Sequence, residues 1–168
     1  MAATIGAKIE VQGEQQYTSS IKKINQETKE LKSEMELLTS SFDKNTSAEE
    51  KAAAKSEVLS RQIDVQQQKV DLLTRKYDSE QEELSRLKAE MEKATQEYGA
   101  NSKEAAKAET EYNKFASATS KTKTELNNAQ ASLNKMKTEL EQTQNPTKEE
   151  AEAVGDVFNM KFSMRLKN

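Results

Sequence analysis

The sequence lacks the residues on which most enzyme and metal chemistry depends. Its 168 residues include no cysteine, no histidine and no tryptophan, and only four glycines and one proline. Without cysteine or histidine, the chain has no thiol nucleophile, no imidazole base and no tetrahedral zinc site. The glycines are too scattered to form a phosphate-binding loop. We therefore expect no enzymatic activity, no catalytic residues, no cofactor, no metal and no small-molecule substrate.

Long apolar runs are also missing. The longest uncharged stretch, 126–134, is far shorter than a membrane span, and no signal-like hydrophobic segment follows a basic start. Hydrophobic and charged residues each make up 33% of the chain, and the mean hydropathy is −0.99. A chain this polar forms either a disordered ensemble or long helices that bury a narrow stripe. The net charge of −3 is too balanced for electrostatic nucleic-acid binding by the chain as a whole. We expect a soluble, non-enzymatic protein without a specific nucleic-acid partner.

Within the first thirteen residues, Ile5, Ala7, Ile9 and Val11 alternate with Gly6, Lys8 and Glu10, which is the period of a β-strand with one buried face. Ile5, Ile9 and Val11 lie on the apolar face, and Gly13 ends the pattern. A single strand is unstable alone. Segment 1–13 is therefore predicted to be a strand that contacts its own chain, a second copy or a partner.

From Tyr17 onward, apolar residues recur with the heptad period of a left-handed coiled coil, with position a at the multiples of seven and position d three residues later. Alanine dominates the apolar residues outside these positions. We predict an all-α fold of long coiled-coil helices over 14–144, as an extended rod or as helical hairpins, with the short N-terminal β-strand. The predicted seam residues are Ile21, Ile24, Leu31, Met35, Leu38, Leu59, Ile63, Val70, Leu73, Tyr77, Leu84, Leu87, Met91, Tyr112, Phe115, Leu126, Leu133, Met136 and Leu140.

Two breaks divide this region into predicted helices at about 17–43, 48–98 and 102–144. Ser47 with Glu50, and Asn101 with Glu104, have the spacing of capping boxes that start new helices. The heptad phase does not slip across either break. That continuity favours a mostly collinear rod within an assembly, whereas a lone chain is free to fold back into hairpins.

The number of helices around the seam stays open. The apolar residues Leu37, Val58, Val65 and Leu72 fall at position c and widen the apolar face, as three or more helices require. β-branched residues at position a with leucine at d instead favour dimers. We expect a homo-oligomer, with a trimer favoured.

Several seam positions are polar. They either control register and loosen the coil or are simply tolerated in a marginal seam. The polar residues are Thr28, Ser56, Gln66, Glu80 and Thr119.

Pro146 ends the heptad region, and Thr147 with Glu150 forms another capping spacing. Segment 147–168 is predicted to be a short helix. It either starts a missing domain or lies on a membrane surface or a partner.

Segments at both the start and the middle of the chain form a family pattern. They are 6–14 (Gly-Ala-Lys-Ile-Glu-Val-Gln-Gly-Glu), Tyr17, Ile21, Ile24, 31–35 (Leu-Lys-Ser-Glu-Met), Phe42 and 98–102 (Tyr-Gly-Ala-Asn-Ser). Over about residues 4–145 the chain resembles the amino-terminal region of phage tail tape measure proteins, of the type in phages and prophages of Gram-positive bacteria.

The resemblance implies a structural rod inside the tail tube that sets tail length and scaffolds tail assembly. The implied partners are the tail tube protein and the tail assembly chaperones, and the implied locations are the virion tail and, during assembly, the host cytoplasm. At about 1.5 Å per residue, the heptad region would extend about 190 Å. Family members are usually longer, so a fragment, a truncated prophage product and a borrowed module all remain open. The alternative function is a cytosolic coiled-coil scaffold or adaptor.

Overall fold

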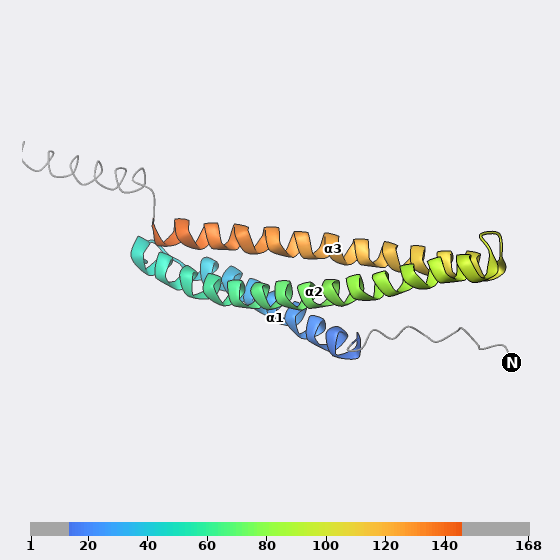
Figure 1. The fold of residues 1–168 in the computed structure, drawn as a ribbon. Coiled ribbons are helices and arrows are strands. Elements are labelled where there is room, and N and C mark those ends of the chain that lie inside the picture. The colour runs from blue at the N-terminus through green and yellow to red at the C-terminus, as the bar shows by residue number, and fades with distance from the viewer. Residues whose placement is uncertain (1–13, 146–168) are drawn as a thin grey trace, which may run out of the picture. The chain divides into compact units, whose positions relative to one another are not determined.

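The computed structural model describes residues 14–145, which form three long helices in chain order (Figure 1). They are α1 (Glu14–Ser41), α2 (Ala48–Tyr98) and α3 (Lys103–Gln144). The all-helical character of this part of the chain agrees with the predicted fold class. The predicted strand at 1–13 and the predicted short helix at 147–168 lie outside the described residues.

The helices are long because nothing within them interrupts the backbone. None of the three contains glycine or proline, and each is rich in alanine, glutamate, lysine or glutamine, which have high helix propensity. Glu49 and Glu50 in the first turn of α2 face the positive end of that helix's dipole. The breaks therefore fall where local turn chemistry, rather than propensity within the helix, ends each element.

The connection between α1 and α2 is held by side-chain hydrogen bonds to the backbone. Ser47 N donates to Glu50 Oε2 at 2.9 Å, and Glu50 N donates to Ser47 Oγ at 3.1 Å. This reciprocal pair is the predicted capping box. Just before it, the Asp43 carboxylate accepts hydrogen bonds from Asn45 N at 2.7 Å and Thr46 N at 2.9 Å.

The connection between α2 and α3 contains the single residue with positive φ among those described. Gly99 has φ of 87°, a conformation that glycine adopts without steric cost. Its N–H still bonds to Thr95 O at 3.0 Å, so the turn follows directly from the last turn of α2. The cap of α3 is Ser102, whose Oγ accepts from Ala105 N at 3.0 Å; the prediction of Asn101 as the capping residue is wrong by one position.

The chain divides into two compact units, and each contains a segment of all three helices. The first unit comprises, among the described residues, 14–28 and 65–132, and the second comprises 29–64 and 133–145.

In the first unit, α1 lies antiparallel to α2. Lys69 Nζ donates to Asn25 Oδ1 at 3.2 Å, and Lys76 Nζ lies 4.5 Å from the centre of the Tyr17 ring. Residue numbers thus rise along α2 as they fall along α1. The two contacting lysines are one heptad apart and occupy position g of α2.

On another side of α2, the first unit holds α3, again antiparallel. Gln66 Nε2 donates to the Ala129 carbonyl at 2.8 Å, and Thr122 Oγ1 donates to Glu80 Oε1 at 3.1 Å. Position d of α2 therefore faces α3, while position g faces α1.

The second unit repeats the antiparallel pairing of α1 with α2. Gln62 Nε2 donates to the Leu31 carbonyl at 3.1 Å, and Arg61 forms an ion pair with Glu34. The chain therefore reverses direction at both connections, as the hairpin alternative predicted for a lone chain. The unbroken heptad phase did not decide this point, because an antiparallel neighbour uses the same seam positions as a collinear one.

Candidate functional site

The predicted seam residues are among the least exposed residues of the described helices. Every seam residue is buried or half-buried, and none is exposed. Ile24, Leu31, Leu59, Val70, Leu73, Leu87 and Leu133 are buried. Ile21, Met35, Leu38, Ile63, Tyr77, Leu84, Met91, Tyr112, Phe115, Leu126, Met136 and Leu140 are half-buried. The predicted strand contacts, Ile5, Ile9 and Val11, lie outside the described residues.

Three of the four apolar residues at position c pack within the chain, and the fourth, Leu37, is 69% exposed. Val58 and Val65 are buried and Leu72 is half-buried. Val58 lines a groove with Leu38 of α1 in the second unit. The wide apolar face of α2 is therefore shared between α1 and α3 of the same chain. The trimer remains a prediction.

The interior of the first unit is partly polar. Gln66, Glu80, Thr119 and Thr122 are all at least nine-tenths buried. The sequence identified the first three as polar seam positions. Thr122 was missed, although it also occupies position d. Small buried residues at seam positions, Ala105 and Ala129, were missed for a similar reason: alanine is common throughout the chain and carries little pattern signal.

Glu80 is the most unusual of these residues. Its side chain is 7% exposed, and its Oε1 accepts from Thr122 and lies 3.7 Å from Lys76 Nζ. Its Oε2 is buried without a hydrogen-bond partner. A buried carboxylate oxygen without a partner reduces stability, because nothing replaces the water that it loses on folding.

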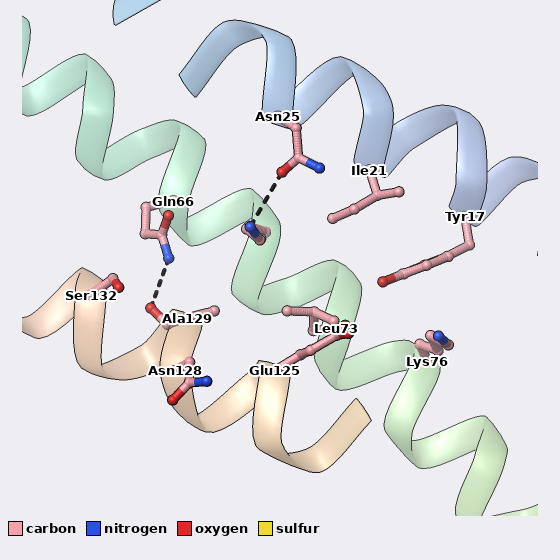
Figure 2. A pocket seen from close by; sticks show the side chains of 11 residues that line it. Tyr17, Ile21, Asn25, Gln66, Leu73, Lys76, Glu125, Asn128, Ala129 and Ser132 are labelled. Carbon is pink, nitrogen blue, oxygen red and sulfur yellow. Dashed lines mark hydrogen bonds between the residues drawn. The ribbon is translucent and has the colours of Figure 1, made fainter. Parts of the chain in front are cut away.

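A groove of about 580 Å³ lies among the three helices of the first unit (Figure 2). Tyr17 and Ile21 project from α1 toward Leu73 of α2, with Glu125 on α3 opposite them. The lining residues are Tyr17, Ile21, Asn25, Gln66, Lys69, Leu73, Lys76, Glu125, Asn128, Ala129 and Ser132.

The Tyr17 side chain lines the groove and lies near the charged groups of Glu80, Glu125 and Lys76. Partial burial, followed by the negative charges of Glu125 and Glu80, raises the pKa of the Tyr17 hydroxyl above its ordinary value of 10.0. These effects all favour the neutral phenol. The Lys76 ammonium over the ring adds a cation–π contact, so Tyr17 anchors the start of α1 to α2.

The chemistry of the groove suits helix packing. Its lysines and its carboxylate have opposite charges, so the lining does not favour a ligand of one sign. Across residues 14–145, no group of three or more acidic side chains is placed to hold a metal ion. Over the same range, no helix combines the length and apolar character needed to cross a membrane. What the groove residues do is fix the positions of the three helices through specific polar contacts.

Comparison with known proteins finds no match: neither a family model, nor a curated protein, nor a solved structure is similar to the chain.

Proposed function

We propose that this protein is a phage tail structural protein of the tape measure type, a coiled-coil rod in the lumen of the tail tube that sets tail length and scaffolds tail assembly. The observation that carries the proposal is the seam: the predicted seam residues, which all follow one heptad phase, are buried or half-buried. A surface built on one phase can pair in a collinear rod as well as in a hairpin.

Of the two segments that resemble the family more specifically, the predicted strand and 31–35, the second lies within the described residues. Residues 31–35 lie in α1 of the second unit, where Leu31 is buried and its carbonyl accepts from Gln62. Glu34 forms an ion pair with Arg61. These residues therefore contribute to the α1–α2 contact of the second unit.

The polar interior supports a rod that must be assembled and later released. Gln66, Glu80 and Thr122 occupy buried positions where leucine would add apolar contact. A marginal seam costs less to open than an apolar one. We propose that the helices exchange contacts within the chain for contacts with further copies, with the tail tube protein and with the tail assembly chaperones. The chain would act in the host cytoplasm during assembly and in the virion tail afterwards.

Tail length tests this proposal directly. In the phage that encodes the chain, an in-frame deletion of four whole heptads from α2 should shorten an extended helix by about 42 Å, at about 1.5 Å per residue. Electron microscopy of purified virions measures tail length to the required precision when many tails are averaged. Duplication of the same heptads should lengthen the tail by the same amount.

The matched control is a full-length variant in which exposed side chains are replaced within the same four heptads. Because its chain length is unchanged, its tails should keep their normal length. Normal-length tails from both the deletion and the duplication would reject a length-setting role. That outcome would favour the alternative, a cytosolic coiled-coil scaffold or adaptor.

A further inference from the structure

The connection between α2 and α3 combines a glycine hinge with space around it. Gly99 has φ of 87°, and a Cβ placed there would meet no atom within 4 Å. The helix α2 ends at Tyr98, directly before this residue, and α3 begins at Lys103, a few positions after it. The positive φ of Gly99 is incompatible with a right-handed helix, so it separates the two helices. If residues 99–102 adopted helical angles, α2 and α3 would form one continuous helix.

The side chains of the connection suit that continuous helix. Tyr98 and Asn101 occupy seam positions a and d, in phase with the helices on both sides. Yet Tyr98 is 60% exposed, one of the large hydrophobic side chains that the fold leaves in solvent. A seam tyrosine is exposed here because the chain turns before the seam can cover it.

The helix contacts on either side of the turn are compatible with a two-fold axis at this point. Gln66 contacts Ala129, and Glu80 contacts Thr122. In each pair, the two residues lie at similar sequence distances before and after Gly99. Two continuous helices crossing antiparallel at residues 98–101 would therefore make the same pairs between chains.

We propose that two copies of this chain exchange α3 through opening of the Gly99 hinge. In the exchanged dimer, α3 of each copy occupies the place of α3 in the other, Gln66 meets Ala129 of the second copy, and α1 stays on its own α2. Tyr98 of each copy packs against the second copy across the two-fold axis. The proposal stands on the hairpin and does not depend on a role in tails.

Exchange of α3 between two copies leaves most helix contacts unchanged. The contacts along α2 and α3 are identical in the monomer and in the dimer, so they do not favour either state. What differs is the turn, which is replaced by helix in both chains, and the Tyr98 side chain, which becomes buried. Concentration then sets the balance, because the dimer gains by mass action.

A single substitution at the turn can shift the balance between the monomer and the exchanged dimer. Gly99→Ala disfavours positive φ and favours helix at both connections of each dimer, so the dimerisation constant should rise by roughly tenfold to a hundredfold. Ala100→Gly, its neighbour, should lower the constant. Tyr98→Ala in the Gly99→Ala background should also lower it, while leaving the helix content by circular dichroism unchanged. Size-exclusion chromatography with light scattering over a range of concentrations measures all of these.

Cross-linking distinguishes exchange from any other dimer. The chain has no cysteine, so single introduced cysteines are unique. A mixture of Glu80→Cys and Thr122→Cys chains, both carrying Gly99→Ala, should give heterodimers with a short bis-maleimide. A mixture of Asn25→Cys and Lys69→Cys chains should not, because α1 stays with its own α2.

Either of two results would overturn the proposal. One is a Gly99→Ala protein that is monomeric at every concentration or forms trimers. The other is a dimer in which the 80/122 mixture fails to cross-link between chains. Since these measurements use the purified chain alone, they can fail while the tail-length prediction holds, and the reverse is also true.

Discussion

Glu80 of α2 and Thr122 of α3 meet inside the first unit, where the threonine hydroxyl donates to Glu80 Oε1 at 3.1 Å. The second carboxylate oxygen is buried and has no partner. Thr122 Oγ1 also lies 3.5 Å from the Ala118 carbonyl, so the hydroxyl keeps an acceptor if the glutamate is removed. The pair therefore specifies which helix faces meet, at a cost in stability that falls mainly on Glu80.

Replacing that carboxylate with an apolar side chain should stabilise the protein. We expect Glu80→Leu to raise the free energy of unfolding by about 1–3 kcal/mol, because it removes a buried oxygen without a partner and adds apolar contact at position d. Urea denaturation followed by circular dichroism measures the change. The control is Glu82→Leu at an exposed position of the same helix, which should alter stability by less than about 0.5 kcal/mol. A loss of stability in Glu80→Leu would mean that the contacts with Thr122 and Lys76 outweigh the cost of burial.

Shortening an apolar side chain of the seam should instead destabilise the protein. Leu73 is 1% exposed, so Leu73→Ala should lower the free energy of unfolding by about 2–5 kcal/mol through lost contact and a residual cavity. Leu37→Ala removes the same atoms from a side chain that is 69% exposed, and it should cost less than about 1 kcal/mol. Similar urea midpoints for the two variants would contradict the assignment of Leu73 to the core.

The sequence predicts the buried face far better than the path of the chain. Leu73 and Leu133 are seam residues by spacing and are among the most buried side chains. The capping box of Ser47 and Glu50 is confirmed, because its signal is local. The fold-back at Gly99 is not encoded in the heptads, since rod and hairpin use the same seam positions along the helices on either side of the turn. The fold-back depends on the positive φ of Gly99, and the hydrophobic pattern contains no information about that angle.

The residues of the candidate site were predicted unevenly for related reasons. Polar seam positions such as Gln66 stand out against an apolar repeat, so they could be found. Their partners could not, because Gln66 bonds to a backbone carbonyl, which every residue has. Ser102 lies next to Asn101, and both residue types cap helices, so spacing alone chose the wrong one.

The turn before α2 should make stability depend on pH. Hydrogen bonds from the Asn45 backbone, the Thr46 side chain and the Thr46 backbone hold the pKa of Asp43 below its ordinary value of 3.8. A folded-state pKa below the unfolded value gives stability that is present above pH 3.8 and lost as the pH falls through the folded value.

The Asp43→Asn variant tests this dependence. Asparagine keeps an acceptor oxygen but cannot titrate, so the variant should lose less stability between neutral and acidic pH than the unmodified chain does. Part of the acid dependence should remain, because hydrogen bonds from Ser47 also lower the pKa of Glu50. Urea midpoints measured across the acidic range give the comparison. Parallel pH curves for the two proteins would contradict the role of Asp43.

Tyr17 makes the corresponding prediction at alkaline pH. Burial and the charges of Glu125 and Glu80 raise the pKa of its hydroxyl above 10.0. The neutral phenol is thus favoured by folding, so its contribution to stability is complete below pH 10.0 and is lost as the pH rises through the folded value. The difference in tyrosinate absorbance between the unmodified chain and Tyr17→Phe isolates this titration from that of the other tyrosines.

Glu125→Gln should shift the Tyr17 titration to lower pH, because it removes one of the repelling charges. Glu97→Gln, several turns along α2 from Lys76, should leave the titration in place. A Tyr17 step at the ordinary tyrosine value, unmoved by Glu125→Gln, would mean that the start of α1 does not pack against α2 and α3 in solution. The groove would then be open on the side of α1, and the polar contacts of Gln66 and Glu80 with α3 would have to hold the first unit together without it.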